Sequence, residues 1–189
     1  YDLDRRMATR EDIENLKAQG IDLKLDFILN HLSVLSPQFQ DILQKGDDSP
    51  YRDFFIDWNK FWAGCGEMTA EVYIQPEPRY IREMFFRKPG LPILMARLPD
   101  GREVPYWNTF YQEVRYAPVD AQDLMPLGLQ YGEANDLAHR INRALAQGEK
   151  PAQMELPSAV RELLESRRRY LGQMDLNLNS PLVWDYYDE

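Results

Sequence analysis

The sequence has one cysteine, Cys65, only two histidines and no long apolar run. A single cysteine cannot form an internal disulfide, and a chain without a Cys/His cluster lacks the ligands of a zinc site. No stretch approaches the roughly 20 apolar residues of a transmembrane helix, and the charged segment 1–10 does not resemble a secretory signal. These absences predict a cytoplasmic protein with no membrane partner.

Positive charge is scarce as well. The chain has 22 Lys and Arg residues against 31 Asp and Glu, a net charge of −9. Such a chain repels phosphate backbones and anionic lipid surfaces, so we expect no nucleic-acid partner. Its 189 residues, 44% of them hydrophobic and 28% charged, have the composition of a globular protein that can bury a core.

Local patterns in the first quarter of the chain indicate an α/β unit. A capping-box pattern with a terminal glycine predicts a helix over 9–20, and a dense apolar run predicts a buried strand over 23–29. A Ser-Pro start with a closing glycine predicts a second helix over 36–46.

The rest of the chain changes character twice. Aromatic residues mixed with Pro and Gly exclude a long helix over 47–101, where we expect short strands near 71–74 and 80–86 and a turn at 99–101.

Helical spacing returns over 134–145, and a further helix begins at Pro157 with Leu171 still on its apolar side. A short strand over 173–177 and a last helix from Ser180 follow.

The polar pair Asn30-His31 ends the predicted strand 23–29. α/β barrels place functional side chains at the carboxyl ends of their strands. Strand alternation puts Asp26, Ile28 and Asn30 on one side, which would face the barrel interior. In the simpler alternative, Asn30 and His31 only form hydrogen bonds with the following loop.

The run from Leu25 to His31 resembles the first signature region of glycoside hydrolase family 13, the α-amylase family, in which Asp-x-x-x-Asn-His ends the third barrel strand. Further runs resemble the sucrose phosphorylase-like branch of that family and follow in the same order: 36–43, 51–55, 88–92, 106–110 and 173–177. The resemblance thus spans nearly the whole chain.

Two features depart from sucrose phosphorylases. First, a helical stretch at about 115–171 separates the Trp-x-x-Phe motif (107–110) from the Gln-x-Asp motif (173–175), whereas the two motifs lie close together in those enzymes. Second, Leu98 stands near the position at which those enzymes have an aromatic residue that contacts the sugar. The resemblance is therefore closer to relatives that act on sucrose 6-phosphate, glucosylglycerol or glucosylglycerate, and the acceptor sugar or polyol stays open.

This resemblance implies an α/β fold that is a fragment of a (β/α)8 TIM barrel with an inserted α+β B domain. Residues 1–35 would supply a helix, the third strand and the histidine loop of the barrel. Residues 36–172 would form the B domain with its helical extension at about 115–171, and 173–189 would return to the barrel. Both ends of the chain are expected to be cuts within a larger protein.

The implied parent is a retaining α-glucoside phosphorylase, an enzyme that transfers a glucosyl group to phosphate. Its carboxylate nucleophile, its Glu acid/base and a third carboxylate would all lie beyond Glu189, so we expect this chain to be inactive alone. Inorganic phosphate would be the co-substrate, with no other cofactor and no metal. The expected partners are the α-glucoside and the rest of the barrel.

By the same resemblance, His31 matches the histidine that forms hydrogen bonds with the glucosyl hydroxyls, and Asn30 is expected to orient the loop beside it. Pro89, Leu91 and Leu98 of the B domain are candidates to line the substrate site. Arg87, Trp107, Phe110 and Tyr111 are weaker candidates for its acceptor side, and we expect core packing for Trp107 and Phe110.

Other conspicuous residues have simpler explanations. Arg167–Arg169 would suit a phosphorylated acceptor, but such a run usually forms a solvated helix face. His139 is expected to be structural or exposed, and the acidic pairs Asp47-Asp48 and Asp185 with Asp188 to be surface carboxylates without a catalytic role.

Two alternatives stay open from the sequence. One is an α-glucosidase, amylase or transglucosidase of the same family, which would keep His31 but use water or a sugar as acceptor. The other is a non-catalytic carbohydrate-binding or interaction module. The second is less favoured, because one buried strand over 23–29 without neighbours would leave backbone groups unpaired.

Overall fold

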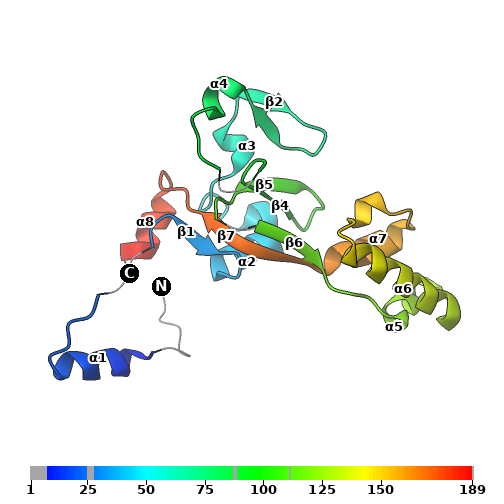
Figure 1. The fold of residues 1–189 in the computed structure, drawn as a ribbon, viewed down its shortest axis with the longest axis horizontal. Coiled ribbons are helices and arrows are strands. Elements are labelled where there is room, and N and C mark those ends of the chain that lie inside the picture. The colour runs from blue at the N-terminus through cyan, green and yellow to red at the C-terminus, as the bar shows by residue number, and fades with distance from the viewer. Residues whose placement is uncertain (1–7, 25–27, 87–88, 111, 189) are drawn as a thin grey trace.

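The structure is a computed structural model that describes residues 8–24, 28–86, 89–110 and 112–188. A β-rich centre carries an aromatic lobe on one side and a helical lobe at one end, whereas the first helix stands apart (Figure 1). The helices are α1 (Arg10–Ala18), α2 (Pro37–Lys45), α3 (Trp58–Phe61), α4 (Pro78–Ile81), α5 (Ala121–Leu124), α6 (Tyr131–Ala146), α7 (Ser158–Ser166) and α8 (Pro181–Asp188). The strands are β1 (His31–Ser33), β2 (Gly66–Met68), β3 (Ile74–Pro76), β4 (Ile93–Arg97), β5 (Glu103–Trp107), β6 (Gln112–Tyr116) and β7 (Arg168–Asp175).

The central sheet joins segments that are far apart in the sequence. Its strand order is β1-β7-β6, and both pairings are antiparallel. His31 lies opposite Asp175, and Val114 lies opposite Tyr170. An isolated bridge between Phe55 and Leu176 continues the pairing beyond β7.

The β4–β5 hairpin and the helix α2 complete the main core. Phe39 of α2 makes edge-to-face contacts with Phe55 and with Tyr106, each at a centroid distance of 5.6 Å. The hairpin closes through Leu98, whose backbone N–H donates to the carbonyl of Arg102 at 2.8 Å. Burial of these large apolar side chains is the main stabilising contribution to the centre of the chain.

A second core forms the aromatic lobe of α3, β2, β3 and α4. Trp58 and Trp62 are buried with Ile74, and the ring centroids of Trp58 and Trp107 lie 4.6 Å apart. The indole N–H of Trp58 donates to the carbonyl of Ile74 at 2.7 Å. This bond satisfies a buried donor and fixes α3 against the β2–β3 hairpin.

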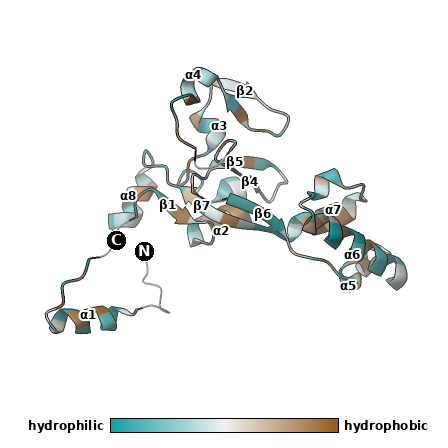
Figure 2. Ribbon diagram, in the orientation of Figure 1, coloured by the Kyte–Doolittle hydropathy of each residue, from teal (hydrophilic) through white to brown (hydrophobic). Residues whose placement is uncertain are grey.

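The helical lobe has a core of its own. α6 buries one face, with Ala134, Leu137, Ala138 and Ile141, against Val160 and Leu164 of α7, α5 and the segment before it. In Figure 2, both α6 and α7 carry hydrophobic and hydrophilic residues, as expected of helices that cover one side of a core. None of the helices in the described part of the chain has the length and hydrophobicity that a bilayer crossing needs.

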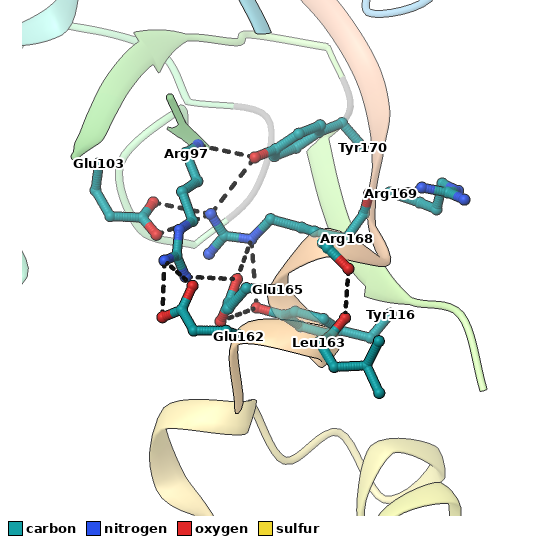
Figure 3. A network of polar contacts seen from close by, with 10 residues as sticks. Arg97, Glu103, Tyr116, Glu162, Leu163, Glu165, Arg168, Arg169 and Tyr170 are labelled. Atoms are coloured by element: carbon teal, nitrogen blue, oxygen red, sulfur yellow. Dashed lines mark hydrogen bonds and ion pairs between the residues drawn. The ribbon is translucent and has the colours of Figure 1, made fainter. Parts of the chain in front are cut away.

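A network of ion pairs joins the helical lobe to the sheet (Figure 3). The Arg168 guanidinium donates to both carboxylate oxygens of Glu103 at 2.8 and 3.0 Å and lies 3.3 Å from Glu165 of α7. Arg97 of β4 forms a two-oxygen contact with Glu162 of α7 at 2.8 and 3.1 Å. Charges from three strands, β4, β5 and β7, therefore hold α7 against the hairpin.

Most predicted helices are confirmed. The helices predicted over 9–20, 36–46 and 134–145 correspond to α1, α2 and α6, and α8 follows Ser180. The turn at 99–101 closes the β4–β5 hairpin.

Several predicted elements were wrong. The structure describes no strand at 23–24 or 28–29, and residues 25–27, with Asp26, lie outside the described residues. Strand pairing begins only at His31 and is antiparallel, so the parallel barrel strand is not seen in the described chain. The strand expected over 80–86 is a short helix and a turn, because Pro78 begins α4. The strand expected near 71–74 begins only at Ile74.

The end of α7 also differs from the prediction. α7 ends at Ser166, and β7 already begins at Arg168, so Leu171 lies in a strand. Arg168 and Arg169 therefore belong to a sheet and not to a solvated helix face. Their pairing with Arg115 and Tyr116 of β6, more than 50 residues away, cannot be read from local spacing.

The close approach of β2 and β3 generates the first prediction. A Cβ on Gly66 would lie 2.1 Å from the Gln75 carbonyl oxygen, so Gly66→Ala must push the strands apart and should lower the free energy of unfolding by about 1–3 kcal/mol. Gly132→Ala on α6 is the control, because nothing lies within 4 Å of a Cβ added at this position. This substitution should raise the free energy of unfolding by about 0.5–1 kcal/mol. Urea denaturation measures both, and equal midpoints for the two variants would contradict the hairpin geometry.

The ion-pair network generates the second prediction. The Arg168 side chain is only 11% exposed and Glu165 only 9%. Arg168→Met removes the cation that pairs with Glu103 and leaves Glu165 with the more distant Arg97 at 3.7 Å, so it should cost about 3 kcal/mol of unfolding free energy. Lys60→Met is the matched control, because Lys60 and Asp53 form an ion pair in which the side chains are 60% and 62% exposed. Thermal unfolding should show a large shift for the first variant and almost none for the second.

Candidate functional site

His31 is the first residue of β1 and directly follows Asn30. Its ring Nδ1 lies 2.9 Å from the Asn30 side-chain oxygen, so Asn30 restrains the imidazole. Burial lowers the pKa of His31 below its usual value of 6.5. The imidazole is therefore neutral at neutral pH, a state in which it can both donate and accept a hydrogen bond.

An aromatic ring covers one side of this histidine. The ring of Phe110, which lies just before β6, is 4.4 Å from the His31 ring with an angle of 47° between the planes. Phe110 is half-buried and not part of the fully buried core, in contrast to the packing role expected for it. Trp107 does pack as expected, on the tryptophan cluster of the aromatic lobe.

Asp175, the last residue of β7, lies directly opposite His31 in the sheet. Its two carboxylate oxygens accept hydrogen bonds from the backbone N–H of Thr109 at 2.7 Å and from the Thr109 hydroxyl at 3.1 Å. Burial raises the pKa of Asp175 to about 6, although the two bonds from Thr109 act in the opposite direction. His31, Phe110 and Asp175 thus meet from three segments.

Sequence reasoning missed Asp175 as a site residue. The signal was present, because Asp175 is the acidic member of the Gln-x-Asp-Leu-Asn motif. Its partner Thr109, however, is 66 residues away. No local spacing links the two.

The B-domain candidates lie in different surroundings. Pro89 is exposed, and Leu91 packs against the tryptophan cluster of the aromatic lobe. Leu98 is only 3% exposed and belongs to the main core with Leu94 and Ala96, so its burial does not favour direct contact with a sugar. Arg87 and Tyr111 lie outside the described residues.

The remaining charged candidates have partners or are exposed. Arg167 donates to Asp123 at 2.8 Å, and Arg168 belongs to the network with Glu103. Asp47 forms ion pairs with Arg52 and Arg102, and His139 is exposed on α6. Among the described residues, no three His, Cys, Asp or Glu side chains gather as a metal-binding group.

Comparisons with known proteins define the family. The chain is 43% identical over all of its 189 residues to a sucrose 6(F)-phosphate phosphorylase of Ilumatobacter coccineus, and these residues make up 27% of that protein. Over 112 residues, 59% of the chain and 21% of the relative, it is 31% identical to a glucosylglycerol phosphorylase of Marinobacter adhaerens. The chain belongs to the sucrose phosphorylase-like branch of glycoside hydrolase family 13. No family model matches it.

A solved structure of this family shares the fold. The crystal structure of sucrose 6F-phosphate phosphorylase from Thermoanaerobacter thermosaccharolyticum covers 98% of the chain with a TM-score of 0.56 and 23% sequence identity, and the chain covers 25% of that structure. The chain thus spans about a quarter of the length of these family 13 relatives. Because β1 is antiparallel to β7, membership of the family rests on the sequence comparisons and not on a parallel strand at His31.

The raised pKa of Asp175 generates the third prediction. Between the usual value of 3.8 and about 6, the folded chain holds a proton on Asp175 that the unfolded chain has released. The resulting contribution to stability is complete below the unfolded-state pKa of 3.8 and is lost as the pH rises through the folded-state pKa of about 6. Stability of the wild type relative to Asp175→Asn should therefore fall between about pH 4 and pH 6. Urea midpoints across this range test the prediction, and a constant difference would contradict it.

Proposed function

We propose that this chain forms part of a retaining α-glucoside phosphorylase that transfers a glucosyl group to inorganic phosphate. The observation that carries the proposal is the 43% identity, over the whole chain, to a sucrose 6(F)-phosphate phosphorylase. The favoured donor is sucrose 6-phosphate, with glucosylglycerol, glucosylglycerate or sucrose as related possibilities. Phosphate is a co-substrate, and the proposed location is the cytoplasm.

In this proposal, residues 1–35 and 173–189 belong to a (β/α)8 barrel, and 36–172 form an inserted B domain with a helical extension. The two proposed barrel segments meet in space, which supports the division. The Leu176 backbone N–H donates to the Asn30 carbonyl at 3.0 Å, and the Tyr187 hydroxyl donates to the Ile28 carbonyl at 2.7 Å. An insertion must leave and re-enter its parent domain at neighbouring points, as these contacts allow.

The proposed role of His31 follows from its neutral, half-buried imidazole. A neutral ring can form a hydrogen bond with a glucosyl hydroxyl without bringing another charge into the site. Such a bond accelerates the reaction if it strengthens as the sugar ring distorts toward an oxocarbenium-like transition state. The catalytic carboxylates are proposed to come from other parts of the protein, so the 189 residues alone are expected to be inactive.

The proposed activity is tested with the whole protein that contains this chain. It is incubated with sucrose 6-phosphate, sucrose or glucosylglycerol, with and without inorganic phosphate, and α-glucose 1-phosphate is measured. Phosphate-dependent release of that product supports the proposal. Products of hydrolysis alone, formed equally with and without phosphate, would support a hydrolase of the same family and overturn the phosphorylase.

The role of His31 generates the fourth prediction. In the same protein, His31→Ala removes a hydrogen bond that is strongest in the transition state, so kcat/KM should fall by about 100-fold or more. His139→Ala is the control, because His139 is the other histidine of the chain and is exposed on α6. Steady-state kinetics measure both, and equal activity of the two variants would refute the assignment.

A further inference from the structure

The half-buried carboxylate of Asp175 has an unusual environment. Among the described residues, no cation lies within ion-pair distance of it, and Thr109 supplies both of its side-chain hydrogen bonds. Even partial burial of a carboxylate without a cation is unfavourable, as the raised pKa of Asp175 reflects. An asparagine would be buried at a lower cost, but in the same orientation its carbonyl oxygen replaces only one of the two acceptors, and its amide N–H would share the Thr109 hydroxyl oxygen with the Trp107 indole N–H. The carboxylate is therefore suited to holding Thr109 at two points.

The segment that Asp175 holds is also fixed by the residues that precede Thr109. The Asn108 backbone N–H donates to the Pro92 carbonyl at 2.7 Å, and the Trp107 indole N–H donates to the Thr109 hydroxyl at 3.1 Å. Phe110 follows directly. With Thr109 held by Asp175, the chain has little freedom to move the Phe110 ring away from its position.

That position is against His31. The ring centroids of Phe110 and His31 are 4.4 Å apart, within the distance at which aromatic rings restrict each other. Asp175 can also influence His31 directly, because the two residues face each other across the β1–β7 ladder. The hydrogen bond from Leu176 to Asn30 shows that they form a non-hydrogen-bonded pair, the type in which facing side chains lie closer.

We propose that Asp175 and Thr109 are positioning residues that hold Phe110 against His31 and so fix the imidazole in the glucosyl-binding site. This inference rests on the proposed function, because it assumes that His31 contacts the glucosyl group. β1 has only three residues, so the strand itself gives the ring little restraint. A catalytic group displaced by about 1 Å can lose about 100-fold in rate, and the positioning contacts therefore matter for activity more than for stability.

The experiment compares variants of the whole protein in the glucosyl-transfer assay. Thr109→Val removes the hydroxyl but keeps the backbone N–H and the shape of the side chain, and Thr109→Ser restores the hydroxyl. Asp175→Asn removes one of the two acceptors. We expect kcat/KM to fall about 10-fold for Thr109→Val and about 10- to 100-fold for Asp175→Asn, mainly through kcat. Thr109→Ser should stay close to the wild type.

A double-mutant cycle separates positioning from a purely structural role. In a His31→Ala background, Thr109→Val and Asp175→Asn should each change kcat/KM by less than about 2-fold, because the group they position is absent. Asp100→Asn is the matched control, since Asp100 also accepts a hydrogen bond from a backbone N–H, that of Arg102 at 3.0 Å, but in an exposed turn. It should leave kcat/KM unchanged.

Each outcome decides between the claims. Unchanged activity of Thr109→Val, or losses of equal size with and without His31, would overturn the positioning role while the proposed function stands. If Asp175→Asn does not fold, Thr109→Val and its serine rescue carry the test. If the wild type only hydrolyses α-glucosides, the phosphorylase is overturned but the cycle still tests positioning on hydrolysis. A wild type without activity on any α-glucoside overturns both.

Discussion

The pairing of β1 with β7 is the interaction on which the rest of the structure depends. It places residues 31–33 beside residues 173–175, so everything between them must leave this point of the sheet and return to it. The main core forms where α2 and the β4–β5 hairpin cover the resulting sheet, and the aromatic lobe and the helical lobe follow with separate cores. The ladder also brings His31 opposite Asp175. One antiparallel contact thus organises both the fold and the candidate site.

The sequence alone predicted those helices whose boundaries are determined by capping residues at their own ends. Ser36 accepts from the backbone N–H of Phe39, and Pro37 occupies the first turn of α2, as the Ser-Pro pattern predicts. The same holds for Thr9 and Asp12 at the start of α1. Strands whose pairing partners lie far away in the sequence could not be predicted in this way. β7 was missed over its first half because the arginine run fits a solvated helix face until β6 and Glu103 supply its partners.

The residues of the candidate site also divide into those that the sequence identifies and those that only the three-dimensional contacts place there. His31 and Asn30 form one contiguous motif, so the sequence identifies them directly. Phe110 and Asp175 belong to motifs that the sequence also shows, but their placement next to His31 depends on the β1–β7 register and on the Thr109 hydrogen bonds. The spacing of residues along the chain cannot predict such long-range contacts. Leu98 illustrates the opposite case, because the family resemblance placed it near a residue that contacts the sugar, while its side chain lies in the core.

The central claim is that His31 contacts the glucosyl group of an α-glucoside. A crystal structure of the whole protein with a bound α-glucoside tests it most directly. The account predicts a ring nitrogen of His31 within about 3 Å of a glucosyl hydroxyl, with Phe110 still against the imidazole. A sugar bound elsewhere, with the His31 ring turned into a packed interior, would contradict it.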